Sequence, residues 1–368
     1  MKHRSIDAPW TVDMIPESIK HRMGKNLHLK PNHPLEIVKR AIYEAFHDFK
    51  KFETFGPVVS VKNNFDDLLI PADHPSRSKS DTYYVDEDHV LRTHTSAHQH
   101  ELIAGGETRF LVTGDVYRRD EIDKTHYPVF HQMEGVALFH IPSGSPIGPP
   151  DHMERMMKDY MIGMVEKVFG RFGKAQEQPV PKTRFVESYF PFTTPSWELE
   201  IDWNGEWLEV AGCGLVHPEV IKRAGNGKSV MELGGWAFGV GLERLAMLVF
   251  GIPDIRLFWS EDERFVNQFK DLDSRFKPFS VQPNCYKDMA FWIPAGYSEN
   301  DFYQIVRDLH GDLVESVKLI DKFSKNGTDS HCYRINYRSM DRTLTNEEIN
   351  VRQQQLRDRM KELKVVLR

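Results

Sequence analysis

Hydrophobic positions recur along the chain with two different spacings, which predict helices in some segments and strands in others. Between residues 34 and 49, apolar side chains recur three or four positions apart, and Pro34 suits the first turn of the amphipathic helix that this spacing predicts. A second helix is predicted over about 151–169, where methionines line the apolar side. Simple core packing explains that methionine stripe.

Alternating apolar and polar positions predict antiparallel strands between these helices and beyond them. The strands lie at 109–120, 130–139, 196–203 and 206–214. The first two are joined by a polar loop near 121–129, and the last two by the dipeptide Asn204-Gly205, a strong hairpin signal. The run 235–251 is read as a glycine-rich lead into an apolar helix.

The last ninety residues have a pattern of their own. Strand and helix signals follow one another in the order β-α-β-β-α-β, which is typical of a ferredoxin-like domain. We therefore expect an α+β chain with an antiparallel sheet flanked by helices, followed by this smaller domain. The expected division is an extension at 1–33, a main domain at 34–252, a linker at 253–278 and the ferredoxin-like domain at 279–368.

Composition narrows the class of protein. The 368 residues are 40% hydrophobic, enough for a large core in two domains, and no uninterrupted apolar run is long enough to predict a transmembrane helix. Three isolated cysteines favour a reducing compartment and give no zinc pattern. A net charge of −6 means that any nucleic-acid partner must bind a local basic surface. The first residues show no secretory signal, and Asp7 and Asp13 make them a poor transit peptide.

The stretch "THYPVFHQMEG", 125–135, is unusually polar for the start of a half-buried strand. Alternation places Phe130, Gln132 and Glu134 on one face, and Arg118 and Asp120 of the preceding strand can adjoin it. An aromatic ring, an amide, a carboxylate and a guanidinium together suit a zwitterionic or phosphorylated ligand. The simpler alternative is a solvated face with surface ion pairs. His131 points the other way and is interpreted as structural support.

A second candidate is the run "GVGLERLAM", in which two glycines precede a helix that carries Arg244. Glycines at a helix start let a phosphate approach, but this pattern alone is weak. The chain has neither a Walker loop nor a dinucleotide-binding fingerprint.

An arginine on a strand, a long loop and a later Gly-x-Gly-x-x-Arg helix resemble motifs 2 and 3 of class II aminoacyl-tRNA synthetases. Between residues 64 and 256 the chain also carries, in family order, "NFDDLLIPADHPSR", "LRTHTSAHQ", "GDVYRRDEID", "FHQMEG", "YFPFTTPSWE", "WLEVAGCG" and "GIPDIR". These stretches resemble the catalytic subunit of the phenylalanyl-tRNA synthetase family. The C-terminal segment resembles the ferredoxin-fold anticodon-binding domain. One chain with both parts resembles the organellar, mitochondrial-type branch.

The resemblance implies a phenylalanine–tRNA ligase that uses ATP and Mg²⁺. On the ATP side it implies that Arg118 holds the α-phosphate and that Arg244 and Phe130 lie on opposite faces of the adenine. His126 would reach a phosphate, Asp120 would lie near the adenine amino group, and Glu209 would be a protein ligand of Mg²⁺.

On the amino-acid side, the resemblance implies three ligands of the phenylalanine ammonium group, namely Ser96, Gln132 and Glu134. It places His94 near the carboxylate and Ala237 on the pocket floor. Phe190 and Phe192 would hold the substrate ring edge to face.

The expected partners are L-phenylalanine and tRNA(Phe), with no membrane. The resemblance implies that the amino acid goes to the 2′-hydroxyl of the terminal adenosine. Candidate tRNA contacts in the C-terminal domain are Arg334, Arg338, Arg352 and Arg357, although a solvated helix surface explains the last two equally well. We expect a monomer in the mitochondrial matrix or another organelle. Two alternatives stay open, an amino-acid-activating enzyme with another acceptor and a catalytically inactive RNA-binding paralogue.

Overall fold

Most of the chain can be described in the computed structural model. The described residues are 15–141, 150–176, 180–225, 233–278, 284–325, 327–340 and 342–368. Residues 1–14 of the expected extension and 279–283 at the expected start of the C-terminal domain lie outside them.

Seven strands form the central sheet, in the order β1-β4-β5-β9-β8-β7-β6. Neighbouring strands are antiparallel, except for the parallel pair β1 and β4. The strands are β1 (Lys50–Phe52), β4 (Arg109–Tyr117), β5 (Val129–His140), β6 (Thr183–Ser188), β7 (Thr193–Trp203), β8 (Glu206–Val216) and β9 (Leu233–Gly241). The two predicted hairpins are therefore confirmed as β4–β5 and β7–β8.

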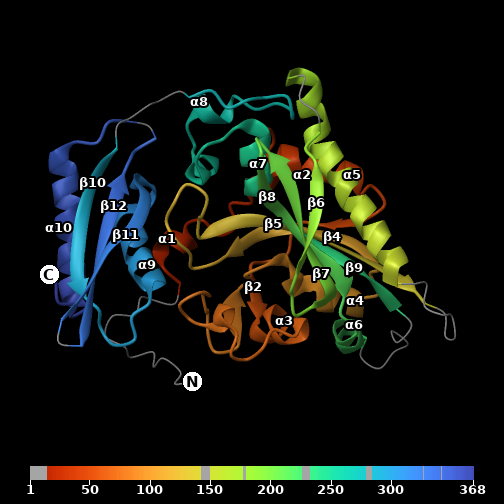
Figure 1. The fold of residues 1–368 in the computed structure, drawn as a ribbon, viewed down its shortest axis with the longest axis horizontal. Coiled ribbons are helices and arrows are strands. Elements are labelled where there is room, and N and C mark those ends of the chain that lie inside the picture. The colour runs from red at the N-terminus through yellow and green to blue at the C-terminus, as the bar shows by residue number, and fades with distance from the viewer. Residues whose placement is uncertain are drawn as a thin grey trace.

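Helices cover the two sides of this sheet unequally (Figure 1). On one side α2 (Pro34–Ala45), α5 (Pro150–Gln176) and α7 (Leu242–Phe250) bury the main core. On the other side α4 (Gln99–Ala104) and α6 (Pro218–Ala224) cover only one end of the strands, beside α3 (Val61–Asn64) and the short β2 (Val58–Ser60) and β3 (His89–Leu91) pair. Because α4 and α6 pack on the distal half of β5, the proximal half of that face is left for a cleft.

Strand β9 was not predicted, because its many glycines resemble a loop. Its alternation is nevertheless regular, since Trp236, Phe238 and Val240 all pack into the main core. Ala237 and the intervening glycines face the other side. The sequence signal was thus a strand with small residues on its cleft face.

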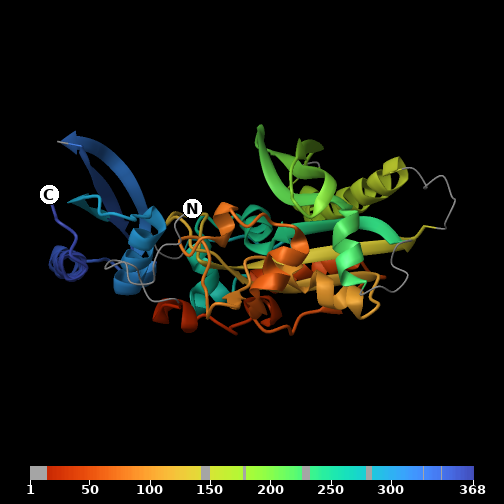
Figure 2. The ribbon, with the colours of Figure 1, turned by 90° about the horizontal axis from the view of Figure 1, so that it is seen from below.

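The C-terminal domain has the predicted ferredoxin-like order. It contains β10 (Cys285–Trp292), α9 (Glu299–His310), β11 (Val314–Lys325), β12 (Thr328–Tyr337) and α10 (Asn346–Glu362). The sheet order is β10-β12-β11, and a bridge between Phe291 and Leu367 supplies the start of the closing strand. Both helices pack on one face of the sheet, and the other face is open (Figure 2). Among the helices of the described ranges, none is both long and apolar enough to cross a membrane.

The segment expected to be a linker is partly ordered against the main domain. It contains the 3-10 helix η5 (Ile255–Trp259) and α8 (Glu263–Val266). Phe258, Phe265 and Phe269 from this segment are buried in the main core.

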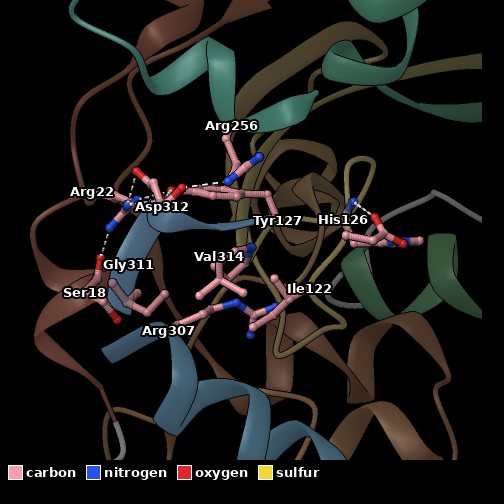
Figure 3. A pocket seen from close by; sticks show the side chains of 13 residues that line it. Ser18, Arg22, Ile122, His126, Tyr127, Arg256, Arg307, Gly311, Asp312 and Val314 are labelled. Carbon is pink, nitrogen blue, oxygen red and sulfur yellow. Dashed lines mark hydrogen bonds and ion pairs between the residues drawn. The ribbon is translucent and has the colours of Figure 1, made fainter. Parts of the chain in front are cut away.

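The N-terminal residues, the β4–β5 loop and the C-terminal domain meet at one place (Figure 3). The Arg22 Nε donates to the Tyr127 hydroxyl at 2.6 Å, and that hydroxyl donates to Asp312 at 2.6 Å. Arg22 also pairs with the Asp312 carboxylate at 2.9 Å. These residues line a pocket at the domain boundary.

Candidate active site

The side chains of Arg118 and Phe130 meet at the open end of the β4–β5 hairpin. Val116 pairs with Phe130 in the strand register, and β4 ends one residue later at Tyr117. The guanidinium carbon of Arg118 lies 5.1 Å from the centroid of the Phe130 ring. Its Nε donates to the backbone carbonyl of Thr93 at 2.9 Å, which fixes the orientation of the fork. The predicted juxtaposition of these two side chains is therefore present.

Two glycines of β9 form a bare floor beside the hairpin. Gly239 lies opposite Glu134, and Gly241 lies opposite Gln132. A Cβ atom added to either glycine would meet no heavy atom within 4 Å. The space above these glycines is therefore not occupied by the protein itself, which is what a ligand cleft requires.

Glu134 lies at the inner end of this floor and is only 2% exposed. Neither of its carboxylate oxygens has a hydrogen-bond partner of acceptable geometry among the described residues. Burial raises the pKa of Glu134 to about 7, although the neighbouring Ser96 and Gln99 side chains counteract part of this effect. A buried carboxylate without a partner is costly, and a ligand with a positive charge would relieve that cost.

His94 directly follows Thr93, whose carbonyl binds Arg118, and it leads into a short 3-10 helix. Burial, with a further contribution from the Arg118 charge, lowers the pKa of His94 to about 3. Its two ring nitrogens are buried and have no partner among the described residues. The neutral ring can therefore donate one hydrogen bond to an acceptor in the cleft without adding charge.

Phe190 and Phe192 stand above the opposite part of the floor. Their ring centroids are 6.0 Å apart and their planes differ by 18°, so the two rings stack on each other. Phe190 also covers Gly212 of β8, where an added Cβ would lie 2.9 Å from the ring. Ala237 is 4% exposed and lies near the α4 and α6 end of this face. An apolar wall thus stands over Gly212 of β8, which is in line with Gly239 and Glu134 across the sheet.

Arg244 lies in the first turn of α7, at the outer edge of the floor. It donates to the backbone carbonyl of Glu209 at 3.1 Å, and its guanidinium is 3.7 Å from the Glu209 carboxylate. A register shift in the β7–β8 pair places Glu209 opposite Glu200. Burial raises the pKa of Glu209, which Arg244 counteracts and nearby Glu198 and Glu200 reinforce. A carboxylate held among others in this way can bind a cation.

The loop between β4 and β5 carries the remaining candidates on the ATP side. His126 Nδ1 lies 2.8 Å from Asp123, and this hydrogen bond is the main cause that raises the pKa of His126. Glu121 joins these two residues in a group whose ligand atoms lie within 4.8 Å of one another. The Asp120 carboxylate accepts a hydrogen bond from the backbone N–H of Glu121 at 2.8 Å. His126 also lines the pocket at the domain boundary, together with Arg307 and Asp312 of the C-terminal domain, so the loop contacts both domains.

Comparisons with known proteins identify the family to which each part of the chain is related. Residues 19–269 match the family described as tRNA synthetases class II core domain (F), and residues 280–368 match the ferredoxin-fold anticodon binding domain. A phenylalanine–tRNA ligase of Arabidopsis thaliana, described as chloroplastic/mitochondrial, is 50% identical over 96% of this chain and 82% of its own length. A mitochondrial phenylalanine–tRNA ligase of Dictyostelium discoideum is 45% identical over 94% of this chain and 87% of its own length.

The chain belongs to the phenylalanine–tRNA ligase family of class II synthetases. An alpha subunit of phenylalanine–tRNA ligase from Acinetobacter baylyi is 39% identical but covers only 67% of this chain. The full-length likeness is therefore to the organellar members.

In this family member the four candidate tRNA contacts do not form one patch. Arg334 lies on the open face of the C-terminal sheet, where it makes two hydrogen bonds to Asp288, at 2.9 and 2.8 Å. Arg352 and Arg357 lie on α10, which packs on the opposite face. Arg338 lies just beyond β12, which ends at Tyr337. It pairs with Glu315 at 3.2 Å near the domain boundary.

Two residues with clear structural roles were missed at the sequence level. Arg119, next to Arg118, is buried and forms an ion pair with Asp301 of α9 at 2.8 Å. Glu243, next to Arg244, is buried against His131 of β5. Each is next in sequence to an arginine that the motifs identified. Its own partner is far away in the sequence, so no local pattern indicates the contact.

Proposed function

We propose that the cleft binds ATP and L-phenylalanine, joins them as phenylalanyl-adenylate, and passes the amino acid to tRNA(Phe). The observation that carries this proposal is the buried, unpartnered Glu134 at the end of an open glycine floor whose other end is flanked by Arg118 and Phe130. This is an arrangement for a ligand with an ammonium group next to one with phosphates. The family relationship supports the choice of phenylalanine and tRNA.

In the proposed ATP site, Phe130 and Arg244 hold the adenine between them and Asp120 accepts from its amino group. Arg118 binds the α-phosphate through its planar fork, and His126, whose pKa is raised, reaches an outer phosphate. Mg²⁺ would be held mostly by the phosphates, with Glu209 as its protein ligand, and would neutralise part of their charge.

In the proposed phenylalanine site, Glu134, Gln132 and Ser96 bind the ammonium group and neutral His94 donates to the carboxylate. The ring lies against Phe190 and Phe192, with Ala237 below it. The ammonium group of phenylalanine supplies a positively charged partner for Glu134, so binding lowers the free-energy cost of the buried carboxylate.

The chemistry is then positioning and charge stabilisation. The phenylalanine carboxylate oxygen attacks the α-phosphorus in line, the bond from that phosphorus to the β-bridging oxygen breaks, and pyrophosphate leaves. Arg118 remains on the α-phosphate oxygens while negative charge builds on them. A terminal hydroxyl of the tRNA next attacks the carbonyl carbon of the adenylate and releases its proton. The bond from that carbon to the phosphate oxygen breaks, and AMP leaves.

We place the tRNA on the C-terminal domain through Arg334, Arg338, Arg352 and Arg357. The open sheet face supports the assignment of Arg334, because its guanidinium lies 4.1 Å from the ring centroid of the half-exposed Tyr286. Basic and aromatic groups together suit single-stranded RNA. We also propose that the protein acts as a monomer in the mitochondrial matrix or another organelle. A sedimentation mass near 42.9 kDa would agree with the monomer.

The deciding experiment is ATP–pyrophosphate exchange with each of the amino acids, followed by charging of tRNA(Phe). We expect exchange with phenylalanine and formation of phenylalanyl-tRNA. A folded protein without phenylalanine-dependent exchange would contradict the proposal. Exchange without charging of any tRNA would favour an enzyme with another acceptor.

A further inference from the structure

A buried pair of side chains lies directly behind the proposed ATP site. His131 follows Phe130 on β5, and its side chain points away from the cleft. Glu243 precedes Arg244 on α7. His131 is 0% exposed and Glu243 is 3% exposed. One oxygen of the Glu243 carboxylate accepts from the backbone N–H of His131 at 2.8 Å, and the other is 2.7 Å from His131 Nδ1.

The Glu243 carboxylate replaces a backbone carbonyl that the end of β9 does not supply. The ladder between β5 and β9 ends with Gln132 opposite Gly241, because the chain turns into α7 at Leu242. The next backbone N–H on β5, that of His131, would then have no carbonyl to meet. The side chain of Glu243 supplies the acceptor and so continues the pairing beyond the end of β9.

The imidazole is fixed as well. An ionised carboxylate only accepts hydrogen bonds, so with Glu243 in that form Nδ1 of His131 is the donor. On its other side the imidazole packs 5.2 Å from the His28 ring and 6.0 Å from the Trp259 ring, measured between centroids. The two hydrogen bonds therefore tie the first turn of α7 to the start of β5.

We propose that His131 and Glu243 form a positioning pair that sets the distance between Phe130 and Arg244. Each member is directly bonded in sequence to one of these two residues, so the pair connects the two faces of the adenine site from behind. This inference rests on the ATP-binding roles proposed above. In this proposal neither His131 nor Glu243 contacts a ligand directly. The pair should act far more on ATP than on phenylalanine. Gln132, the other neighbour of His131, is already held in the sheet between Gly114 of β4 and Gly241 of β9, and Glu134 lies further along β5.

The experiment measures the KM for ATP and the KM for phenylalanine separately by pyrophosphate exchange in the full chain. His131→Leu removes the side-chain donor, whereas His131→Asn keeps a donor at the position of Nδ1. We expect His131→Leu to lower kcat/KM for ATP by about tenfold to a hundredfold, the usual effect of a small misplacement. The KM for phenylalanine should change by less than about twofold, and His131→Asn should recover most of the loss. Equal changes in both KM values, or no recovery in His131→Asn, would overturn the proposal.

Two further variants distinguish an ATP-selective effect from a general loss of folding. Glu243→Asp keeps the charge but cannot reach both donors, and we expect the same ATP-selective defect with a native near-ultraviolet spectrum. A folded Glu243→Asp protein with an unchanged KM for ATP would contradict the proposal. His310→Leu is the matched control, because His310 is also a buried histidine with two hydrogen bonds, to Arg352 and Tyr337, but lies in the C-terminal domain. It should lose stability without an ATP-selective effect.

Arg244→Ala separates this inference from the function on which it rests. If Arg244→Ala leaves the KM for ATP unchanged, the assigned ATP site is wrong. If Arg244→Ala raises that KM and His131→Leu does not, the site stands and only the positioning role fails.

Discussion

Arg118 and Arg119 are neighbours in the sequence, yet they belong to two regions with opposite properties. Arg118 faces the cleft, where nearby Glu134 is buried without a partner. Arg119 faces the domain boundary, where its partner Asp301 is supplied by the other domain at 2.8 Å. In the cleft, a charged group such as Glu134 has no partner from the described residues and would be paired by a ligand. At the boundary, Arg119 is paired by Asp301 of the other domain.

Further contacts join the β4–β5 loop to the C-terminal domain. Arg307 of α9 donates to the backbone carbonyls of Asp120 and Glu121 in the β4–β5 loop. Ile122 of the same loop is buried in the C-terminal core, and its carbonyl accepts from the N–H of Val317 at 2.9 Å. One short loop thus carries ligand-facing residues on one side and tertiary contacts on the other. Substitutions on its two sides should have different consequences.

The largest effect is expected from Arg118→Ala. Removing the group that meets the developing charge on the α-phosphate should lower kcat in pyrophosphate exchange by about a thousandfold. The melting temperature should change little, because Arg118 is bound to the rest of the protein chiefly through the carbonyl of Thr93. A parallel loss of stability and activity would remove the contrast with Arg119.

Arg119→Ala is the reverse case. It leaves Asp301 buried without its guanidinium partner, so the free energy of unfolding should fall by on the order of 3 kcal/mol. Urea denaturation measures this change. At temperatures where the variant is folded, the KM for phenylalanine should match that of the unaltered protein. Adding Asp301→Ala should restore part of the stability, and no restoration would show that the ion pair is not the cause.

The cleft should also respond to pH through Glu134. With a pKa of about 7, this carboxylate is about one tenth ionised at pH 6 and about nine tenths ionised at pH 8. Because the ammonium group binds the ionised form, the KM for phenylalanine should fall by roughly tenfold between these values. Glu134→Gln should bind phenylalanine weakly with no such dependence. A pH dependence that survives in Glu134→Gln would have to come from another group.

The same residue affects stability with the opposite sign. The pKa of Glu134 is raised from 4.5, so between pH 4.5 and about 7 the folded protein holds a proton that the unfolded chain has released. The ligand-free protein should therefore lose stability as the pH rises through this range. Glu134→Gln should melt at a higher temperature than the unaltered protein at pH 8, and saturating phenylalanine should reduce that difference.

The smallest effect is expected from Gly239→Ala. Its Cβ would meet no protein atom, so folding should be unaffected. The added methyl group would project into space that the ligands occupy, and kcat/KM should fall by about fivefold, the effect of modest overpacking. Gly212→Ala is the comparison, because its Cβ collides with Phe190 and should lower stability as well. Equal behaviour of the two variants would mean that the floor at Gly239 is not open.

The sequence by itself determined the features that depend on local alternation. It placed Phe130, Gln132 and Glu134 on one face of a strand, and it put His131 behind them. It also gave the order of the ferredoxin-like domain. Side chains on a strand alternate by a fixed geometry, so these assignments need no knowledge of neighbouring elements. The same rule could have identified β9, where small and large residues alternate, had its glycines not suggested a loop.

The tertiary structure alone decided which charged groups are satisfied and which are not. Arg119 meets Asp301 across 182 positions of sequence, and His131 meets Glu243 across 112. No comparable partner reaches Glu134 among the described residues. An ion pair in the interior forms only when packing removes both groups from water and brings them within a few ångströms, and that depends on how distant elements meet. For this reason the sequence identified Glu134 as a candidate ligand-binding residue, but only the fold showed that it is a buried carboxylate without a partner.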